Sequence, residues 1–331
     1  MSESSAGLTR HRPMPINIQS PLIDPHGRRV RKLRISLTDK CNLRCHYCMP
    51  LDATFMDERQ YLGAEEYASI IEELVGLGLE EVRMTGGEPL MRKSFGDIAA
   101  GLSGLGLKKI GLTTNGVLLD RHLDVMKQYG VHHLNISLDS LNEDTFRKIT
   151  HGNHLARVLR NIESARRSNF NVKINVVAMR GVNDHEVLDF AEMARTLDVE
   201  VRFLEFMRIG YARHTQTDQF ISARELMTRL ESRYTLTRAT VPADSTSFNF
   251  TLNNGARLGF IASESQPFCG QCSRWRLSAD GILRACLFKD DGHSIRNQPA
   301  PVRALIYQAL LGMKPTTRPV EVLHQMNTIG G

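Results

Sequence analysis

Short apolar segments alternate with amphipathic stretches from about residue 33 to residue 206. The apolar segments are four to six residues long and end in polar or glycine-rich sequence, which is typical of buried strands. The stretches between them repeat apolar residues at the spacing of one helix face, as Tyr67, Ile70 and Leu74 do. The pattern predicts helices near residues 67–75, 95–102, 118–129, 155–168 and 186–197, and strands at Leu33–Leu37, Glu81–Met84, Lys109–Thr113, His133–Ser137, Val172–Val177 and Val201–Phe206.

This alternation also predicts the fold class. Six β/α units of roughly thirty residues each favour parallel strands joined by right-handed crossovers. Because eight such units close a TIM barrel, six predict an α/β fold with an incomplete (β/α)6 TIM-like barrel. In such folds ligands bind at the carboxyl ends of the strands. Polar and glycine-rich sequences stand at those ends here, at Thr85–Pro89, Thr113–Gly116, Ser137–Ser140 and Glu205–Met207.

The pattern changes after about residue 215. One predicted helix, Ala223–Ser232, is followed by short β-like segments with turn signals at Asn253–Gly255 and at Asp280 and Gly281. A further helical stretch lies near Val302–Leu311. We therefore expect a flexible basic N-terminal segment (residues 1–30), a partial barrel (31–215) and a C-terminal region (216–331) that covers the open end of the barrel.

Composition and charge narrow the classes of partner. Hydrophobic residues make up 41% of the chain and charged residues 24%, as in a soluble globular protein, and no apolar run approaches the ~20 residues of a membrane span. The net charge of +6 favours an anionic partner. Basic residues precede the first cysteines without the interleaved aromatic residues that stack on bases, so we expect a phosphate-bearing substrate and no nucleic acid or membrane.

The six cysteines form two sets of three. Cys41, Cys45 and Cys48 have the spacing Cys-x3-Cys-x2-Cys, which suits three corners of a [4Fe–4S] cluster and leaves one iron without a protein ligand. Zinc bound by these cysteines and His46 is the alternative. The second set is Cys269, Cys272 and Cys286. A disulfide framework is not expected at this chain length, and the first fifty residues lack the apolar region of a secretion signal, so we expect a cytoplasmic protein.

The first cysteine set, followed in a β/α chain by Thr85-Gly-Gly-Glu-Pro89, closely resembles the radical S-adenosylmethionine enzymes. From about residue 30 onward the chain resembles one family in that superfamily, the GTP 3′,8-cyclases of molybdenum cofactor biosynthesis. The resemblance rests on several stretches in the same order: Leu33–Asp39, Arg83–Pro89, Asn135–Ser140, Arg202–Met207, the second cysteine set with Arg274–Arg276, and the terminal Gly330 and Gly331.

The resemblance implies roles for individual residues. Cys41, Cys45 and Cys48 would hold the [4Fe–4S] cluster that cleaves S-adenosylmethionine, and Cys269, Cys272 and Cys286 would hold a second cluster whose open iron binds the guanine of GTP. The residues implied at the S-adenosylmethionine site are Tyr47, Gly87, Ser137 and Met207. Those implied in GTP binding are Arg34, Arg83, Thr113, Lys173, Arg274, Trp275 and Arg276, and a catalytic role is implied for Arg274, Arg276, Gly330 and Gly331.

The residues by themselves leave other interpretations open. Basic residues at strand ends, such as Arg34, Arg83 and Lys173, commonly face solvent or form rim ion pairs. Met207 would by default fill a gap in the core. Trp275 stands where a smaller apolar residue is expected, and it either packs beneath the second cluster or narrows the guanine pocket. The terminal glycines are either a tail that enters the active site or an end without a role.

The reaction implied by the resemblance converts GTP to (8S)-3′,8-cyclo-7,8-dihydroguanosine 5′-triphosphate, after a 5′-deoxyadenosyl radical abstracts the 3′-hydrogen. It would need a low-potential electron donor, flavodoxin or ferredoxin, and a downstream cyclic pyranopterin monophosphate synthase. We also expect a homodimer. The alternatives are another radical S-adenosylmethionine enzyme with an auxiliary cluster, such as a peptide-modifying maturase, and a zinc-stabilised nucleic-acid-binding protein.

Overall fold

A computed structural model describes residues 21–318 and 322–329. Within these residues the strands form one twelve-stranded sheet in the order β12-β11-β10-β1-β2-β3-β4-β5-β6-β9-β8-β7, which does not close on itself. Its centre consists of the six expected strands, all parallel, with ends within two residues of the prediction. The incomplete barrel is therefore confirmed. These strands are β1 (Lys32–Ser36), β2 (Glu81–Thr85), β3 (Lys109–Thr114), β4 (His133–Ser137), β5 (Asn171–Ala178) and β6 (Glu200–Glu205).

The C-terminal region extends this sheet at both edges. β9 (Arg257–Ile261) pairs parallel to β6 and continues into antiparallel β8 (Phe248–Leu252) and β7 (Leu236–Ala239). At the other edge β10 (Arg274–Leu277) pairs parallel to β1 and continues into β11 (Ile282–Arg284) and β12 (His293–Ser294). Both expected turn sites join antiparallel strands, and each places a glycine in the left-handed region, Gly255 at φ +89° and Gly281 at φ +90°.

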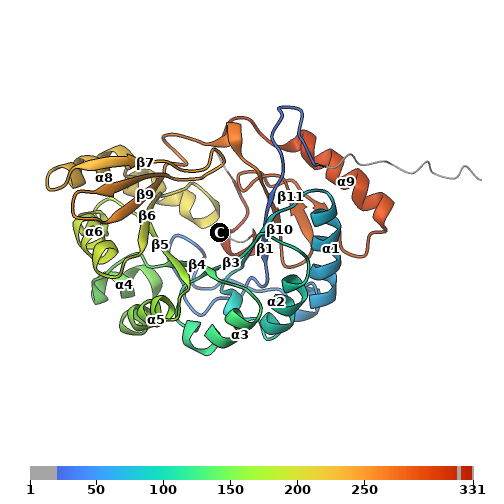
Figure 1. The fold of residues 1–331 in the computed structure, drawn as a ribbon, viewed down its shortest axis with the longest axis horizontal. Helices are drawn as coiled ribbons and strands as arrows, with labels where there is room; N and C mark the ends of the chain where they lie inside the picture. The colour runs from blue at the N-terminus through green and yellow to red at the C-terminus, as the bar shows by residue number, and fades with distance from the viewer. Residues whose placement is uncertain (1–20, 319–321, 330–331) are drawn as a thin grey trace, which may run out of the picture.

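Helices cover the outer side of the curved sheet (Figure 1). The sequence pattern missed α4, whose eight residues are too few for a clear helical period; it is capped by Asn142, whose side-chain oxygen accepts from the Thr145 N–H at 3.0 Å. The helices are α1 (Ala64–Gly76), α2 (Phe95–Ser103), α3 (Leu123–Gln128), α4 (Glu143–Thr150), α5 (Leu155–Arg167), α6 (Val187–Thr196), α7 (Gln216–Gln219), α8 (Ala223–Glu231), α9 (Ala300–Met313) and α10 (Met326–Ile329). Among the described residues, none of these is long and apolar enough to span a bilayer.

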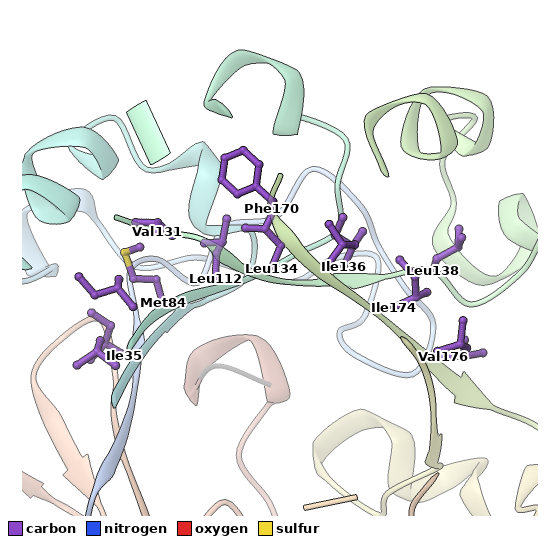
Figure 2. Packing of buried hydrophobic residues seen from close by; sticks show 14 of the residues in the cluster. Ile35, Met84, Leu112, Val131, Leu134, Ile136, Leu138, Phe170, Ile174 and Val176 are labelled. Carbon is purple, nitrogen blue, oxygen red and sulfur yellow. The ribbon is translucent and has the colours of Figure 1, made fainter. Parts of the chain in front are cut away.

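Strand alternation separates an apolar outer face from a polar inner one. Ile35, Met84, Leu112, Ile136 and Ile174 are fully buried, and Figure 2 shows them with the other core residues between the sheet and the helices. Because successive side chains of a strand point to opposite faces, their sequence neighbours point into the barrel. Each buried side chain of this size stabilises the fold by about 1.5–3 kcal/mol. The apolar strand residues therefore form the core between sheet and helices, and the polar residues that alternate with them line the interior of the barrel.

Candidate active site at the mouth of the partial barrel

The two cysteine sets line one cavity. It lies at the carboxyl ends of the central strands, and its volume is about 270 Å³. All six cysteines contribute to its wall, although the two sets lie more than 200 residues apart in the chain. Polar, charged and small residues make up much of the remaining wall, together with two methionines: Arg34, Tyr47, Gly87, Thr113, Asn135, Ser137, Asp139, Asn175, Arg202, Met207, Arg274, Arg276, Lys314 and Met326.

The loop of the first cysteine set is held by backbone hydrogen bonds to two neighbouring segments. The Arg44 and His46 N–H groups donate to the end of α4 at 2.9 Å, and the Glu88 N–H donates to the Lys40 carbonyl at 2.8 Å. A Cβ on Gly87 would lie 2.3 Å from that carbonyl oxygen, so only glycine lets the two loops approach. The paired glycines therefore serve first to accommodate the cysteine loop, a constraint that the sequence did not reveal.

The thiols of this set need a positive partner to ionise. Burial, reinforced by neighbouring negative groups, raises the pKa of Cys41 to about 11 and that of Cys48 to about 12, and it raises the pKa of Cys45 as well. Metal ions bind the thiolate form and supply the missing positive charge. Among the described residues, no three His, Cys, Asp or Glu side chains converge tightly enough for a single ion, and His46 does not line the cavity. Three thiols around an open space fit a polynuclear iron–sulfur cluster.

Tyr47, between two of these cysteines, is oriented by Asp139. Its hydroxyl donates to the Asp139 carboxylate at 2.6 Å, and the second carboxylate oxygen accepts from the Val177 N–H at 2.8 Å. Burial raises the pKa of Asp139 to about 6. The ring of Tyr47 meets Phe206 edge to face. Asp139 belongs to a motif that the sequence singled out, but its role as the partner of Tyr47 needed the fold.

The second cysteine set has a more positive environment. Burial favours the neutral thiol of Cys272, but Arg274 and Lys314 outweigh it and lower the pKa to about 6. Burial raises the pKa of Cys269 and of Cys286. The Phe288 N–H donates to the Cys286 sulfur at 3.4 Å. These three thiols also surround open space, and the cationic neighbours fit a cluster that carries net negative charge.

Several guanidinium groups line the cavity together with the two cysteine sets. Arg34 and Arg276 are partners in register on adjacent strands, and both line the cavity. Arg274 places its guanidinium 3.8 Å from the Cys272 sulfur and over the Phe268 ring. Desolvation and then the charges of Arg276 and Arg274 hold the pKa of Arg34 well below its usual range. The positive charge of this part of the cavity wall therefore favours binding of an anion.

Three predicted GTP-binding residues lie away from the cavity wall. Arg83 lies across Gly111 and donates to the Leu112 carbonyl at 3.1 Å, while Lys173 forms an ion pair with Glu200 at 2.9 Å. Trp275 is fully buried and packs on Tyr307 of α9, so its indole neither touches nor narrows the cavity. Gly330 and Gly331 lie outside the described residues, although the preceding Ile329 carbonyl accepts from Arg276 at 3.4 Å.

Several cavity residues were missed by sequence reasoning. Asn135, Asn175 and Arg202 point inward because they alternate with buried core positions, a signal that was present in the strands. Lys314 and Met326 carry no such signal, because they lie in irregular sequence or in one turn of helix near the end of the chain.

An open barrel of parallel strands with a three-cysteine loop at its carboxyl mouth defines a radical S-adenosylmethionine enzyme. Residues 35–194 match the Radical SAM superfamily, and residues 199–301 match Molybdenum Cofactor Synthesis C. The chain is 55% identical to a GTP 3′,8-cyclase of Synechocystis sp. over 96% of this chain and 97% of that relative. It is 40% identical to a GTP 3′,8-cyclase of Aquifex aeolicus over 83% and 88%. The chain therefore belongs to the GTP 3′,8-cyclase family, whose enzymes act in molybdenum cofactor biosynthesis.

Solved structures with a similar fold are more distant in sequence. Streptococcus suis SuiB bound to its precursor peptide SuiA superposes with a TM-score of 0.65 at 12% identity, over 84% of this chain and 65% of that chain. SuiB bound to S-adenosylmethionine gives a TM-score of 0.64 at 12% identity, over 87% and 68%. At this identity the likeness shows the fold alone.

Proposed function

We propose that this chain converts GTP to 3′,8-cyclo-7,8-dihydroguanosine 5′-triphosphate within the single cavity that both cysteine sets line. The shared cavity is the observation that carries the proposal. Residues 31–215 supply the first cysteine set and residues 216–331 the second, so one cavity would bring S-adenosylmethionine and GTP together. Burial of the bound substrates in this cavity would also suit radical chemistry, because it would keep water and stray hydrogen donors from the reacting carbon atoms.

The first side of the cavity binds S-adenosylmethionine. Cys41, Cys45 and Cys48 would hold a [4Fe–4S] cluster, which when bound supplies one-electron reductive cleavage of S-adenosylmethionine. Tyr47, fixed by Asp139, and the main chain at Gly87 limit where the adenosine portion lies. Ser137 and Met207 complete this wall, the first with a hydroxyl and the second with an adaptable apolar side chain.

The second side binds GTP. Cys269, Cys272 and Cys286 would hold the second cluster next to the guanine, and Arg34, Arg274 and Arg276 would bind the phosphates, with Thr113 as a neutral donor. Guanidinium forks suit phosphate oxygens, and an anion among these cations would relieve their mutual repulsion. Arg83 and Lys173 point into the same barrel and would extend the cationic surface after the Lys173 ion pair rearranges.

Other partners follow from the proposed chemistry. One-electron cleavage needs a low-potential electron donor, for which flavodoxin or ferredoxin are suitable, and the cyclised nucleotide would pass to a separate cyclic pyranopterin monophosphate synthase. We also propose a cytoplasmic homodimer.

GTP binding by an Arg274→Met variant tests the proposal. Loss of a charge-assisted hydrogen bond of about 1.5–3 kcal/mol should weaken binding by roughly 10- to 150-fold in anaerobic equilibrium dialysis of the reconstituted protein. Basal cleavage of S-adenosylmethionine without GTP should persist. Arg257→Met is the matched control, since this arginine is half-exposed and pairs with Asp198 on the outer rim. Unchanged GTP affinity in the Arg274 variant would contradict the assignment.

A further inference from the structure

Lys314 places a buried amino group against the second cysteine set. The residue follows α9 and is 4% exposed. Its Nζ donates to the Cys272 sulfur at 3.4 Å, to the Arg274 carbonyl at 2.6 Å and to the Ala285 carbonyl at 3.2 Å. All three ammonium hydrogens therefore have a partner, and each partner is a cysteine of the set or lies within two residues of one.

The same residue joins the segments that carry the three cysteines. Cys272 and Ala285 belong to separate segments, and Lys314 bonds to both. Its own carbonyl accepts from Arg28 at 2.8 Å, and Arg28 also donates to the Cys269 carbonyl at 2.7 Å. Arg28 is fixed in turn by an ion pair with buried Asp24 at 2.6 Å. The lysine and the arginine thus tie both segments that carry the three cysteines to the end of α9.

The charge of Lys314 is the informative feature. A buried ammonium group is costly unless an opposite charge lies nearby. Within the part of the chain that the structure describes, no ion pair joins Lys314 to a carboxylate, and the acidic group that its Nζ contacts is the Cys272 thiol. The two backbone carbonyls that Lys314 contacts are neutral, and a neutral hydrogen-bond donor would satisfy them equally well. The cysteine set, once it carries thiolates and a cluster, is the anion that makes a lysine suitable here.

We propose that Lys314 is a positioning residue that retains the second iron–sulfur cluster and raises its reduction potential. The inference rests on the proposed function, in that it takes the second cysteine set to hold a cluster. The hydrogen bond to the Cys272 sulfur and the adjacent positive charge stabilise the more negative, reduced form of the cluster. By bracing Cys272 and the backbone before Cys286, Lys314 also resists loss of iron.

The test uses full-length protein in which Cys41, Cys45 and Cys48 are replaced by serine, so that bound iron reports the second set alone. Lys314→Gln, Lys314→Arg and Lys289→Gln are made in this background. Lys289 is the matched control, because it contacts the Met313 carbonyl next to Lys314 but is partly exposed and pairs with Asp291. Each reconstituted protein is titrated with dithionite and followed by EPR, and its iron is challenged with a chelator.

We expect Lys314→Gln to shift the potential to lower values and to lower the chelator concentration that removes half of the iron by about tenfold. Lys314→Arg should restore most of both properties, and Lys289→Gln should change neither. A Lys314→Gln protein that is less stable to heat but has an unchanged potential would show a purely structural lysine and overturn the inference.

A measurement on the unsubstituted lysine covers the case in which the glutamine variant does not fold. Pulsed EPR on the reduced cluster of protein labelled with 15N-lysine should reveal a weak nitrogen coupling that disappears in Lys314→Arg, and its absence would overturn the inference. A second set that binds no iron at all would instead contradict the proposed function. The two failures are therefore distinguishable.

Discussion

Arg34 and Arg276 are partners in register on neighbouring parallel strands, one from the start of the barrel and one from the C-terminal region. Both line the cavity. Burial lowers the pKa of Arg276 to about 10, although the charges of the Cys286 and Cys272 thiols oppose this shift. The charge of Arg276 in turn contributes to the lowered pKa of Arg34. Two buried guanidinium groups at paired positions repel each other, which destabilises the fold unless an anion offsets their charge. Electrostatic repulsion between these two arginines therefore lies at the point where we propose that a triphosphate binds.

Replacing Arg34 should separate stability from binding. In Arg34→Met the repulsion is relieved, so we expect thermal stability to stay equal or to rise while GTP affinity falls at least about tenfold. Differential scanning calorimetry and anaerobic GTP dialysis measure the two quantities. A loss of stability accompanied by unchanged GTP affinity would assign Arg34 a structural role instead.

The two cysteine sets should fail differently. Cys45→Ser removes a proposed cluster ligand from the first set, so S-adenosylmethionine cleavage should be abolished, because cleavage would need the cluster that this set holds. Cys286→Ser should keep part of the basal cleavage and lose conversion of GTP. Both are measured as 5′-deoxyadenosine and cyclised nucleotide by liquid chromatography. Cleavage retained in Cys45→Ser would contradict the assignment of the first set.

Gly87 should not tolerate a side chain. A Cβ at this position meets the Asp39 and Lys40 carbonyl oxygens at 2.6 and 2.3 Å, and both are backbone atoms that cannot rotate away. We expect Gly87→Ala to lower the free energy of unfolding by about 1–3 kcal/mol and to reduce iron in the first set. Gly104→Ala is the control, because nothing lies within 4 Å of its Cβ position. Equal behaviour of the two variants in denaturant titrations would argue against this account.

Asp244 should make stability depend on acid pH. Burial favours its neutral form, but hydrogen bonds from Ser273 and Lys32 and the charges of Lys32 and Arg31 outweigh this and lower its pKa from 3.8 to about 2. A carboxyl whose folded pKa is depressed stabilises the fold above its unfolded pKa and loses that contribution as pH falls through the folded value.

The test is Asp244→Asn, compared with the parent protein in denaturant titrations across pH. The variant should be less stable at pH 7 by on the order of 2 kcal/mol, and the difference should shrink between about pH 4 and pH 2. A difference independent of pH over this window would mean that the aspartate acts through its shape and hydrogen bonds rather than its charge.

Local sequence patterns predicted the six barrel strands and both cysteine sets, because strand burial and turn formation depend on residues that are neighbours in the chain. They did not predict that β9 and β10 add to opposite edges of the barrel sheet, since pairing between strands that are not neighbours in the chain leaves no local signal. Arg34 and Arg83 are partners in register on β1 and β2, yet of the two only Arg34 lines the cavity. The Arg83 side chain instead lies across Gly111, which has no side chain to block it. Lys314 is recognisable only once α9 has brought it to Cys272.

The central claim is that one cavity couples S-adenosylmethionine cleavage to GTP. The direct test is anaerobic: reconstituted, dithionite-reduced protein with S-adenosylmethionine, assayed for 5′-deoxyadenosine with and without GTP. Our account predicts release strongly stimulated by GTP, together with a cyclised guanosine nucleotide. Cleavage indifferent to GTP, from protein shown to carry iron and sulfide in both cysteine sets, would contradict it.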